Sequence, residues 1–392
     1  MKQTLLGIDT ACKLVLASAP VLPVEEVALG AALGRVLAED VVAEHDVPRF
    51  AGSAMDGFAL RSGPAGRTLQ LIGESRAGMP FDGSVEDGQA ARISTGAAVP
   101  SGADAVLQLE LVEDRGTAIV TQDAVTPGRN IRGPGEDLCA GTIVIARGTR
   151  LSPAHIGVGA NAGRAAVRCA RRPRVAILAT GDELVPAGRP LGPGQIHDSN
   201  QLTLEALVQA EGAEVVHTRH VADRAEATRT ALERALPLCD LLLISGGVSV
   251  GAHDHVKPAL EALGVERQFW RVALRPGKPT WCGVRGKTLV LALPGNPVSV
   301  MVTFLLFARP ALAAMQGATT ADRRTVPLGE PLSPHPDRDE CVRVRIEGGA
   351  AYATGPQGSH VLSSMALADG LAVIPRGNEQ LPAGAIVDLV TL

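Results

Sequence analysis

Between residues 174 and 314 the sequence alternates short, continuous apolar runs with longer segments of helical periodicity. The short runs predict strands and the longer segments predict helices. Strands are expected at 175–179, 214–217, 241–245 and 288–293, and helices at 199–210, 224–236, 256–263 and from 297 onwards. Such alternation implies βαβ units and a central, doubly wound, mainly parallel sheet with helices on both faces.

Residues 9–43 are expected to be helical. Asp9 can cap a short helix. A second helix is indicated by apolar residues that recur at helical spacing, namely Leu29, Ala32, Leu33, Val36 and Leu37. Another helical segment is predicted at 151–163.

Two further segments are rich in short β-type runs separated by glycine and proline. Residues 44–143 contain such runs at 68–72 and 105–109, and the last part of the chain contains them at 341–346, 371–375 and 385–392. We therefore expect a β-rich domain ahead of the central one and a small β-barrel or sandwich at the C-terminal end.

Composition excludes several classes of function. The net charge is -4 and aromatic residues make up 2%, which argues against nucleic-acid binding and against binding to acidic membranes. The first ten residues lack the pattern of a signal peptide, and the longest uncharged apolar run, 298–308, is too short to cross a membrane. The helix from Pro297 is apolar all round, so burial in the core is favoured over a dimer contact.

The six cysteines lie far apart, with neither a CxxC pair nor the spacing of metal ligands. This usage is typical of a reduced, cytoplasmic protein without a structural zinc ion.

Three loops follow predicted strands at the edge of the sheet where open α/β proteins bind ligands. Glycines in them allow backbone N–H groups to approach a phosphate. The loops carry Thr180, Gly181 and Asp182; then Ser245, Gly246, Gly247, Ser249 and Gly251; and finally Pro294, Gly295, Asn296 and Pro297. Each loop alone could be a simple turn, but together they predict a nucleotide or phosphate pocket.

Carboxylates accompany these loops. Asp182, Glu183 and Asp254 are expected at one sheet edge, and acids beside a phosphate site are explained by a divalent cation between them. The alternatives are that Asp182 caps a helix and that Asp254 begins the next one. His253 and His255 flank Asp254, but solvated or capping histidines are favoured over metal ligands.

Cations occur nearby. Arg271 and Arg275 alternate along a strand-like run and are expected to project to one side, with Lys278 after a tight turn. Such side chains can bind a pyrophosphate or a tetrahedral oxyanion, the alternative being a solvated surface loop.

A second group of motifs lies in the first half of the chain. It comprises Asp56 in 53–59, Thr95 in 94–97 and Asp137 in 135–137. Spacing alone does not show that these residues meet the pocket at the sheet edge.

Together these motifs resemble one known family over nearly the whole chain. They read SAMDGFA at 53–59, TGAAVPSGADAV at 95–106, GED at 135–137, TGDEL at 180–184, GQIHDSN at 194–200, SGGVSVGAHD at 245–254, RPGKP at 275–279, LPGNPVS at 293–299 and GPQGSHVLSS at 355–364. This set is similar to the MoeA family, the molybdopterin molybdenumtransferases, to which the C-terminal part of gephyrin also belongs.

The resemblance implies four domains. They are a split helical domain at 1–43 plus 144–170, an inserted β-rich domain at 44–143, a molybdopterin-binding α/β domain of MoaB/Mog type at 171–320, and a C-terminal β-barrel at 321–392. Family members are homodimers, so the resemblance places Asp56, Thr95 and Asp137 opposite Glu183, Asp223 and Asp254 across the subunit interface.

The implied reaction uses adenylylated molybdopterin and molybdate, requires Mg²⁺ and releases AMP. Glu183 and Asp254 would help to hold Mg²⁺, the glycine loops would hold the pterin phosphate, and Arg271, Arg275 and Lys278 would attract the anions. The family commonly has lysine at the positions of Arg271 and Arg275. The arginines here preserve the positive charge but replace the compact ammonium group of lysine by a planar guanidinium with several N–H donors. Possible partners are the adenylyltransferase of the pathway and apo-molybdoenzymes.

Two other functions stay open. A scaffold of the same fold could bind molybdopterin without inserting metal, although it would not need Asp56, Glu183 and Asp254. A nucleotide pyrophosphatase would explain residues 174–300 but neither the motif at 53–59 nor the terminal β-domain.

Overall fold

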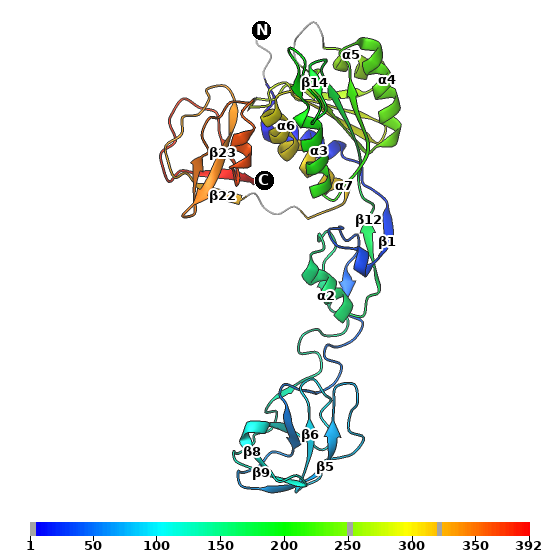
Figure 1. Ribbon diagram of the computed structural model, residues 1–392, viewed down its shortest axis with the longest axis vertical. Coiled ribbons are helices and arrows are strands. Elements are labelled where there is room, and N and C mark those ends of the chain that lie inside the picture. The colour runs from blue at the N-terminus through cyan, green and yellow to red at the C-terminus, as the bar shows by residue number, and fades with distance from the viewer. Residues whose placement is uncertain (1–4, 249–253, 320–323) are drawn as a thin grey trace.

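The computed structural model describes residues 5–248, 254–319 and 324–392. It is elongated, with an α/β body and a small barrel at one end and a separate β-module at the other (Figure 1). The two ends are joined through a narrow middle part that carries α2, β1 and β12. The predicted fold class is confirmed, while the domain boundaries given above stay predictions.

The α/β body is built on a six-stranded sheet. Its strand order is β16 (Glu214–Val221), β13 (Arg174–Thr180), β17 (Leu241–Ser245), β21 (Thr288–Leu293), β20 (Trp281–Arg285) and β18 (Glu266–Trp270). The first four strands are parallel to one another, and β20 is antiparallel to both of its neighbours, β21 and β18, so only β20 runs in the opposite direction. The four predicted strands are therefore confirmed, and β18 and β20 were not predicted.

Helices cover both faces of this sheet, because successive strand residues point to opposite sides. Val175 and Ile177 face a core that includes residues of α1 (Ile8–Ser18), α3 (Ser199–Ala210) and the helix from Pro297. Ala176 and its alternate neighbours face α4 (Ala225–Ala235) and α5 (Val256–Ala262). The short turn η3 (Leu236–Leu238) continues α4.

The apolar helix is one continuous stretch made of α6 (Pro297–Thr303), a π-helical turn η4 (Phe304–Ala308) and α7 (Arg309–Met315). Its 19 residues are long and apolar enough to span a membrane, but 72% of its apolar stretch is buried inside the protein. Core burial was the favoured interpretation, and the packing against the sheet agrees with it.

A small barrel forms the C-terminal part. Its strands are β22 (Arg324–Pro327), β23 (Asp339–Glu347), β24 (Ala350–Ala353), β25 (Gly370–Ile374) and β26 (Ile386–Thr391), and α8 (Ser363–Ala366) lies between β24 and β25. A bridge between Leu328 and Ala351 joins β22 to β24 and closes the circle of strands. β19 (Leu274–Arg275) pairs with β23 and so attaches the barrel to the α/β body.

The remote module contains a second six-stranded sheet, with the order β7 (Ala105–Gln108), β4 (Gly57–Leu60), β6 (Gln89–Ile93), β5 (Thr68–Ser75), β9 (Ala118–Thr121) and β8 (Val112–Asp114). The turn η2 (Leu109–Leu111) connects β7 to β8, and β3 (Gly52–Ser53) pairs with β10 (Ile131–Arg132) nearby. Residues 44–143 are thus β-rich, as predicted.

The middle part pairs β1 (Val24–Ala28) with β12 (Ala166–Ala170), and β2 (Val41–Val42) with β11 (Ile143–Ile145). The predicted helix at 151–163 is present as α2 (Pro153–Asn161), capped by Ser152.

The predicted helix through Leu29 and Leu37 is wrong. Only a 3-10 turn, η1 (Leu29–Ala31), forms there, and Gly34 has a φ of 73°, which an α-helix cannot accommodate. Leu29, Ala32, Val36 and Leu37 are buried as expected, whereas Leu33 is exposed. Leu29, Ala32 and Leu37 belong to a small core shared with residues of β11 and α2. Asp9 lies in the first turn of α1, whose N-cap is Gly7, so the predicted cap is also wrong.

Candidate active site

The three predicted loops meet at one edge of the central sheet. The Thr180 hydroxyl donates to the carbonyl oxygen of Ser245 (3.4 Å), and the amide of Gly246 donates to the carbonyl oxygen of Leu293 (3.1 Å). From α3, Asn200 Nδ2 donates to Ser245 Oγ (2.9 Å) and to the carbonyl oxygen of Gly295 (2.7 Å). The side-chain amide of Asn200 therefore links the loop that carries Ser245 to the loop that carries Gly295.

Packing and backbone conformation require glycine at positions 246 and 247. Gly246 and Gly247 have φ values of 90° and 64°, and a Cβ on Gly246 would lie 2.7 Å from Thr180 Oγ1. A Cβ on Gly295 would lie 3.7 Å from the Cα of Gly246, so the loops touch one another. Ser249 and Gly251, together with His253, lie outside the described residues.

Three carboxylates form what we call the acidic edge, namely Asp182, Glu183 and Asp223. The amide of Asp223 donates to Asp182 Oδ1 (3.1 Å). Burial, followed by the charges of Asp182 and Glu183, raises the pKa of Asp223. The charge of His255 acts in the opposite direction. The acids therefore repel one another, and an added cation would relieve that repulsion.

Asp182 does not cap a helix, since the N-caps of α3 and α4 are Asp198 and Arg224. β14 (Leu184–Val185) follows Glu183 directly and pairs with β15 (Ile196–His197). Gly181, at a φ of 148°, lies under the Glu183 carboxylate, which a Cβ there would approach to 2.7 Å. The unusual backbone of Gly181 thus makes room for Glu183.

Asp254 has a different neighbour from the one expected. Its side chain is 7% exposed and lies 2.7 Å from Lys257 Nζ. Lys257 Nζ also lies 4.0 Å from the centre of the Trp270 ring. Asp254 precedes α5, whose N-cap is His255. Among the residues that the structure describes, no group of three His, Cys, Asp or Glu side chains could hold a metal ion by itself.

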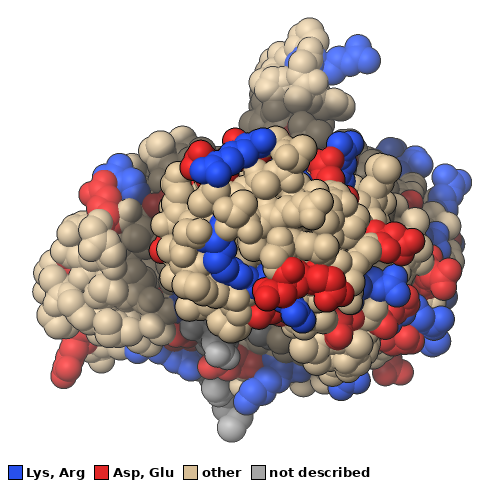
Figure 2. Space-filling view, turned by 90° about the horizontal axis from the view of Figure 1, so that it is seen from below, with Lys and Arg blue, Asp and Glu red and all other residues tan. Residues whose placement is uncertain are grey.

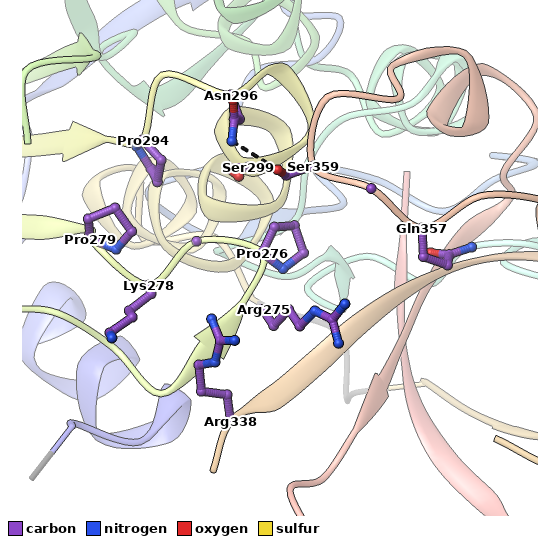
Figure 3. Close-up of a pocket in the computed structure, with 12 residues that line it drawn as sticks. Arg275, Pro276, Lys278, Pro279, Pro294, Asn296, Ser299, Arg338, Gln357 and Ser359 are labelled. Atoms are coloured by element: carbon purple, nitrogen blue, oxygen red, sulfur yellow. Dashed lines mark hydrogen bonds between the residues drawn. The ribbon is translucent and has the colours of Figure 1, made fainter. Parts of the chain in front are cut away.

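A cavity of about 300 Å³, which we call the basic pocket, lies between the α/β body and the barrel. Figure 3 shows Lys278, Arg275 and Arg338 on one side of it and Asn296, Ser299 and Ser359 on the other. The full lining is Arg275, Pro276, Gly277, Lys278, Pro279, Pro294, Asn296, Ser299, Arg338, Gln357, Gly358 and Ser359. Three cations and two hydroxyl groups suit a small oxyanion.

Bonds between the two bodies hold this pocket together. Asn296 Nδ2 donates to Ser359 Oγ (2.9 Å), and the amide of Val298 donates to the carbonyl oxygen of Ser359 (3.2 Å). Asn296 is the N-cap of α6 as predicted, but its side chain makes this contact and no capping bond. Arg275 is paired with Glu340 of β23 at 3.5 Å.

Arg271 does not join Arg275 and Lys278. Its φ of 73° interrupts the alternation of an extended strand, and its guanidinium lies 4.1 Å from the centre of the Trp270 ring. It lines a second cavity, of about 190 Å³, with residues that include Leu6, Leu14 and Trp270. The predicted projection of Arg271 and Arg275 to one side is therefore wrong.

The barrel residues of the pocket were not found from the sequence. Gln357, Gly358 and Ser359 lie in the run 355–364, which carried the family resemblance but no chemical assignment. Arg338 lies in an irregular segment without a motif.

Asp56, Thr95 and Asp137 lie at or near the remote module, away from the central sheet (Figure 1). Asp56 Oδ1 accepts a hydrogen bond from the amide of Thr95 (2.8 Å). The amide of Asp137 donates to the carbonyl oxygen of Val47 (2.9 Å). Within one chain, these residues are not brought to the acidic edge.

Charges of both signs are interspersed on the face seen along the long axis (Figure 2). No broad basic surface is visible there for a nucleic-acid backbone.

Three family models match the chain in order. They are the "MoeA N-terminal region (domain I and II)" at residues 6–163, the "Probable molybdopterin binding domain" at 176–314 and the "MoeA C-terminal region (domain IV)" at 325–392. Together they span most of the chain.

Curated relatives agree with these models. The molybdopterin molybdenumtransferase of Haemophilus influenzae is 35% identical over 372 residues, which cover 91% of each chain. Molybdopterin molybdenumtransferase 2 of Mycobacterium tuberculosis is 37% identical over 376 residues, covering 91% of this chain and 92% of the relative.

A solved structure agrees as well. The molybdopterin biosynthesis MoeA protein of Pyrococcus horikoshii OT3 has a TM-score of 0.85 at 30% identity and covers 99% of this chain and 100% of its own. Motifs, family models, relatives and fold point the same way, and the chain belongs to the MoeA family.

Proposed function

We propose that this protein is a molybdopterin molybdenumtransferase of molybdenum cofactor biosynthesis. It takes adenylylated molybdopterin and molybdate, uses Mg²⁺, releases AMP and transfers molybdenum onto the dithiolene sulfurs. The observation that carries this proposal is the pairing of a cationic pocket with a row of carboxylates beside the same set of loops. The relatives' names supply the reaction class.

The basic pocket is the proposed molybdate site. Lys278, Arg275 and Arg338 supply positive charge, while the hydroxyl groups of Ser299 and Ser359 can bond to oxyanion oxygens. The neighbouring Pro294 and Asn296 belong to the loop that touches Gly246, so the pocket adjoins the proposed phosphate-binding loops. Arg271 lines the second cavity and does not contact the anion in this proposal, so it contributes only the longer-range attraction of its charge.

The acidic edge fits Mg²⁺ in ligand type and charge, because this ion prefers oxygen ligands and uses one or two carboxylates together with substrate phosphates. Glu183 is the proposed ligand, with Asp182 and Asp223 beside it. Mg²⁺ would neutralise the phosphate charge where AMP is released. Asp254 can serve as a second ligand only if its carboxylate leaves Lys257, to which it is bound.

We further propose a homodimer. Asp56 and Thr95 adjoin β4 and β6 of the remote module, and β6 lies at the opposite end of the molecule from β14, which directly follows the acidic edge (Figure 1). The remote module of a second copy can bring them there.

A cytoplasmic location accords with six free cysteines. The proposed partners are the adenylyltransferase of the pathway, which would supply the substrate, and apo-molybdoenzymes, which would receive the product.

The decisive experiment mixes the purified protein with adenylylated molybdopterin, Mg²⁺ and molybdate. We expect AMP release together with reconstitution of an apo-molybdoenzyme. Binding of the substrate without either product would favour the scaffold alternative, provided that a known family member works in the same assay. Release of AMP without reconstitution would favour the pyrophosphatase alternative.

Two companion measurements test the details. Asp254→Ala is expected to abolish AMP release while the circular dichroism spectrum stays unchanged, and normal turnover would remove Asp254 from the site. Light scattering under assay conditions should give the mass of a dimer, and a monomer would contradict the shared site.

A further inference from the structure

We propose that Arg343, buried in the barrel strand β23, is a positioning residue that sets the affinity of the basic pocket for its oxyanion. It does so by fixing the segment 355–359, which we call the pocket loop. This inference rests on the proposed function of that pocket.

Arg343 holds the pocket loop through several hydrogen bonds. Its Nη2 donates to the carbonyl oxygens of Pro356 (3.1 Å) and Gly358 (3.2 Å). Its amide donates to Gln357 Oε1 (2.9 Å), and Gln357 Nε2 donates back to the carbonyl oxygen of Arg343 (3.2 Å). The guanidinium thus bonds to the residues on either side of Gln357, while the Gln357 side chain bonds to the backbone of Arg343.

The pocket loop in turn forms one wall of the basic pocket. Gln357, Gly358 and Ser359 line the cavity, and Gln357 lies on the far side of the pocket from Lys278 (Figure 3). Ser359 is bound from the opposite side by Asn296 and by the amide of Val298. The loop is therefore fixed at both ends, by Arg343 within the barrel and by the first turn of α6 in the α/β body.

The hydrogen bonds to the pocket loop use only one of the three nitrogens of the Arg343 guanidinium. The Arg343 residue is 0% exposed, and its Nε and Nη1 have no hydrogen-bond partner in the described part of the chain. No carboxylate among the described residues lies within ion-pair distance of it. An apolar side chain of similar volume often stabilises a protein more than a buried charge does.

The same features are useful beside an anion. Burial lowers the pKa of the Arg343 guanidinium, but an arginine remains charged at neutral pH. Its charge lies behind the pocket loop. The pocket itself is lined by three other cations, Arg275, Lys278 and Arg338. A fixed loop also avoids the loss of conformational entropy that binding would otherwise cause. Arg343 therefore acts on the anion through the loop and through its charge.

The test measures binding of molybdate alone by isothermal titration calorimetry, with the full-length protein. Five proteins are compared: the wild type, Arg343→Met, Arg343→Lys, Lys278→Met and Arg345→Met. Arg345 is the matched control because it lies two residues further along β23, its side chain is 58% exposed, and it pairs with Glu347. The methionine in Arg343→Met fills a similar space but cannot hold the loop carbonyls.

We expect Arg343→Met to raise the Kd for molybdate by about tenfold. Its melting temperature should stay close to that of the wild type, because removal of a buried charge offsets the loss of its hydrogen bonds to the loop carbonyls. Arg343→Lys should recover part of the affinity, and Arg345→Met should bind like the wild type. In the full reaction, Arg343→Met should raise KM for molybdate and leave kcat within about twofold.

The outcomes separate this inference from the function that it rests on. If the wild type binds no molybdate, or if Lys278→Met binds it normally, the assignment of the pocket is wrong and the inference falls with it. If Lys278→Met weakens binding while a folded Arg343→Met does not, only the inference is overturned. Should Arg343→Met fail to fold, Gln357→Leu replaces it, and an unchanged Kd for that variant is equally decisive against the proposal.

Discussion

The basic pocket and the acidic edge flank the same loops but are built in opposite ways. In the pocket, side chains from two bodies are bound to one another, as Asn296 is to Ser359 and Arg275 to Glu340. At the acidic edge, burial and the neighbouring charges raise the pKa of Asp223. The pocket is thus organised before a ligand arrives, whereas the acidic edge gains most from a ligand that supplies positive charge.

The largest expected effect comes from Glu183→Gln, which removes a charge from the acidic edge and preserves the shape. AMP release at moderate Mg²⁺ should fall on the order of 100-fold, because the proposed Mg²⁺ ligand is weakened. Higher Mg²⁺ should restore part of the rate, and molybdate binding should not change. The measurement is AMP release over a series of Mg²⁺ concentrations.

Glu379→Gln, an exposed acid of the barrel, is the control for this experiment and should behave like the wild type. A Glu183→Gln protein with a normal Mg²⁺ requirement would contradict the proposed division between the two regions.

An intermediate effect is expected from Lys278→Met in the basic pocket. KM for molybdate should rise roughly tenfold through loss of a charge-assisted contact, while kcat at saturating molybdate stays within about threefold. The Mg²⁺ dependence should stay normal, which is the reverse of the Glu183 result. Steady-state kinetics with each component varied in turn checks this.

Lys287→Met provides the matched control, because Lys287 is exposed in the turn between β20 and β21. If Lys278→Met changed the Mg²⁺ and molybdate dependences equally, the two regions would not be functionally separate.

The smallest effect concerns Glu211, a partly buried acid that lies 3.9 Å from Arg150 and outside both regions. Burial raises its pKa from the ordinary value of 4.5, although Arg309 and Arg150 act in the opposite direction. A raised carboxyl pKa stabilises the folded state fully below the unfolded pKa, and this contribution is lost as pH rises through the folded pKa. Glu211→Gln should therefore increase stability at pH 7.5 by less than about 1 kcal/mol and have no effect near pH 4.

Thermal unfolding at the two pH values measures this difference, with Glu226→Gln on the exposed side of α4 as the control. A stabilisation that persists at low pH would show that ionisation of Glu211 is not its cause. Glu211 has cationic neighbours, whereas Asp223 has acidic ones. The measured change therefore shows how strongly burial raises a carboxyl pKa when the neighbouring charges oppose it.

The central sheet and its loops could be predicted because their signals are local. Strands such as 241–245 are continuous apolar runs, and the residues that follow them must lie at one edge of a parallel sheet. This reasoning brought Thr180, Gly246 and Gly295 together correctly.

Other features depend on tertiary contacts or on single backbone angles. The left-handed conformation of Arg271 directs its side chain to Trp270, and no spacing rule anticipates it. Gly34 interrupts an apolar pattern that is otherwise suited to a helix. Arg338 and Ser359 reach the pocket only because the barrel docks against the α/β body, a long-range event without a local signature.

That docking has a consequence for how the molecule unfolds. Cys341, Met365 and Leu371 of the barrel belong to the same apolar core as Ile177 and Leu243 of the central sheet. The remote module keeps its own cores around Phe58 and Ile93. We therefore expect barrel and sheet to unfold as one cooperative unit, so that proteolytic removal of the barrel would also remove part of the apolar core of the α/β body.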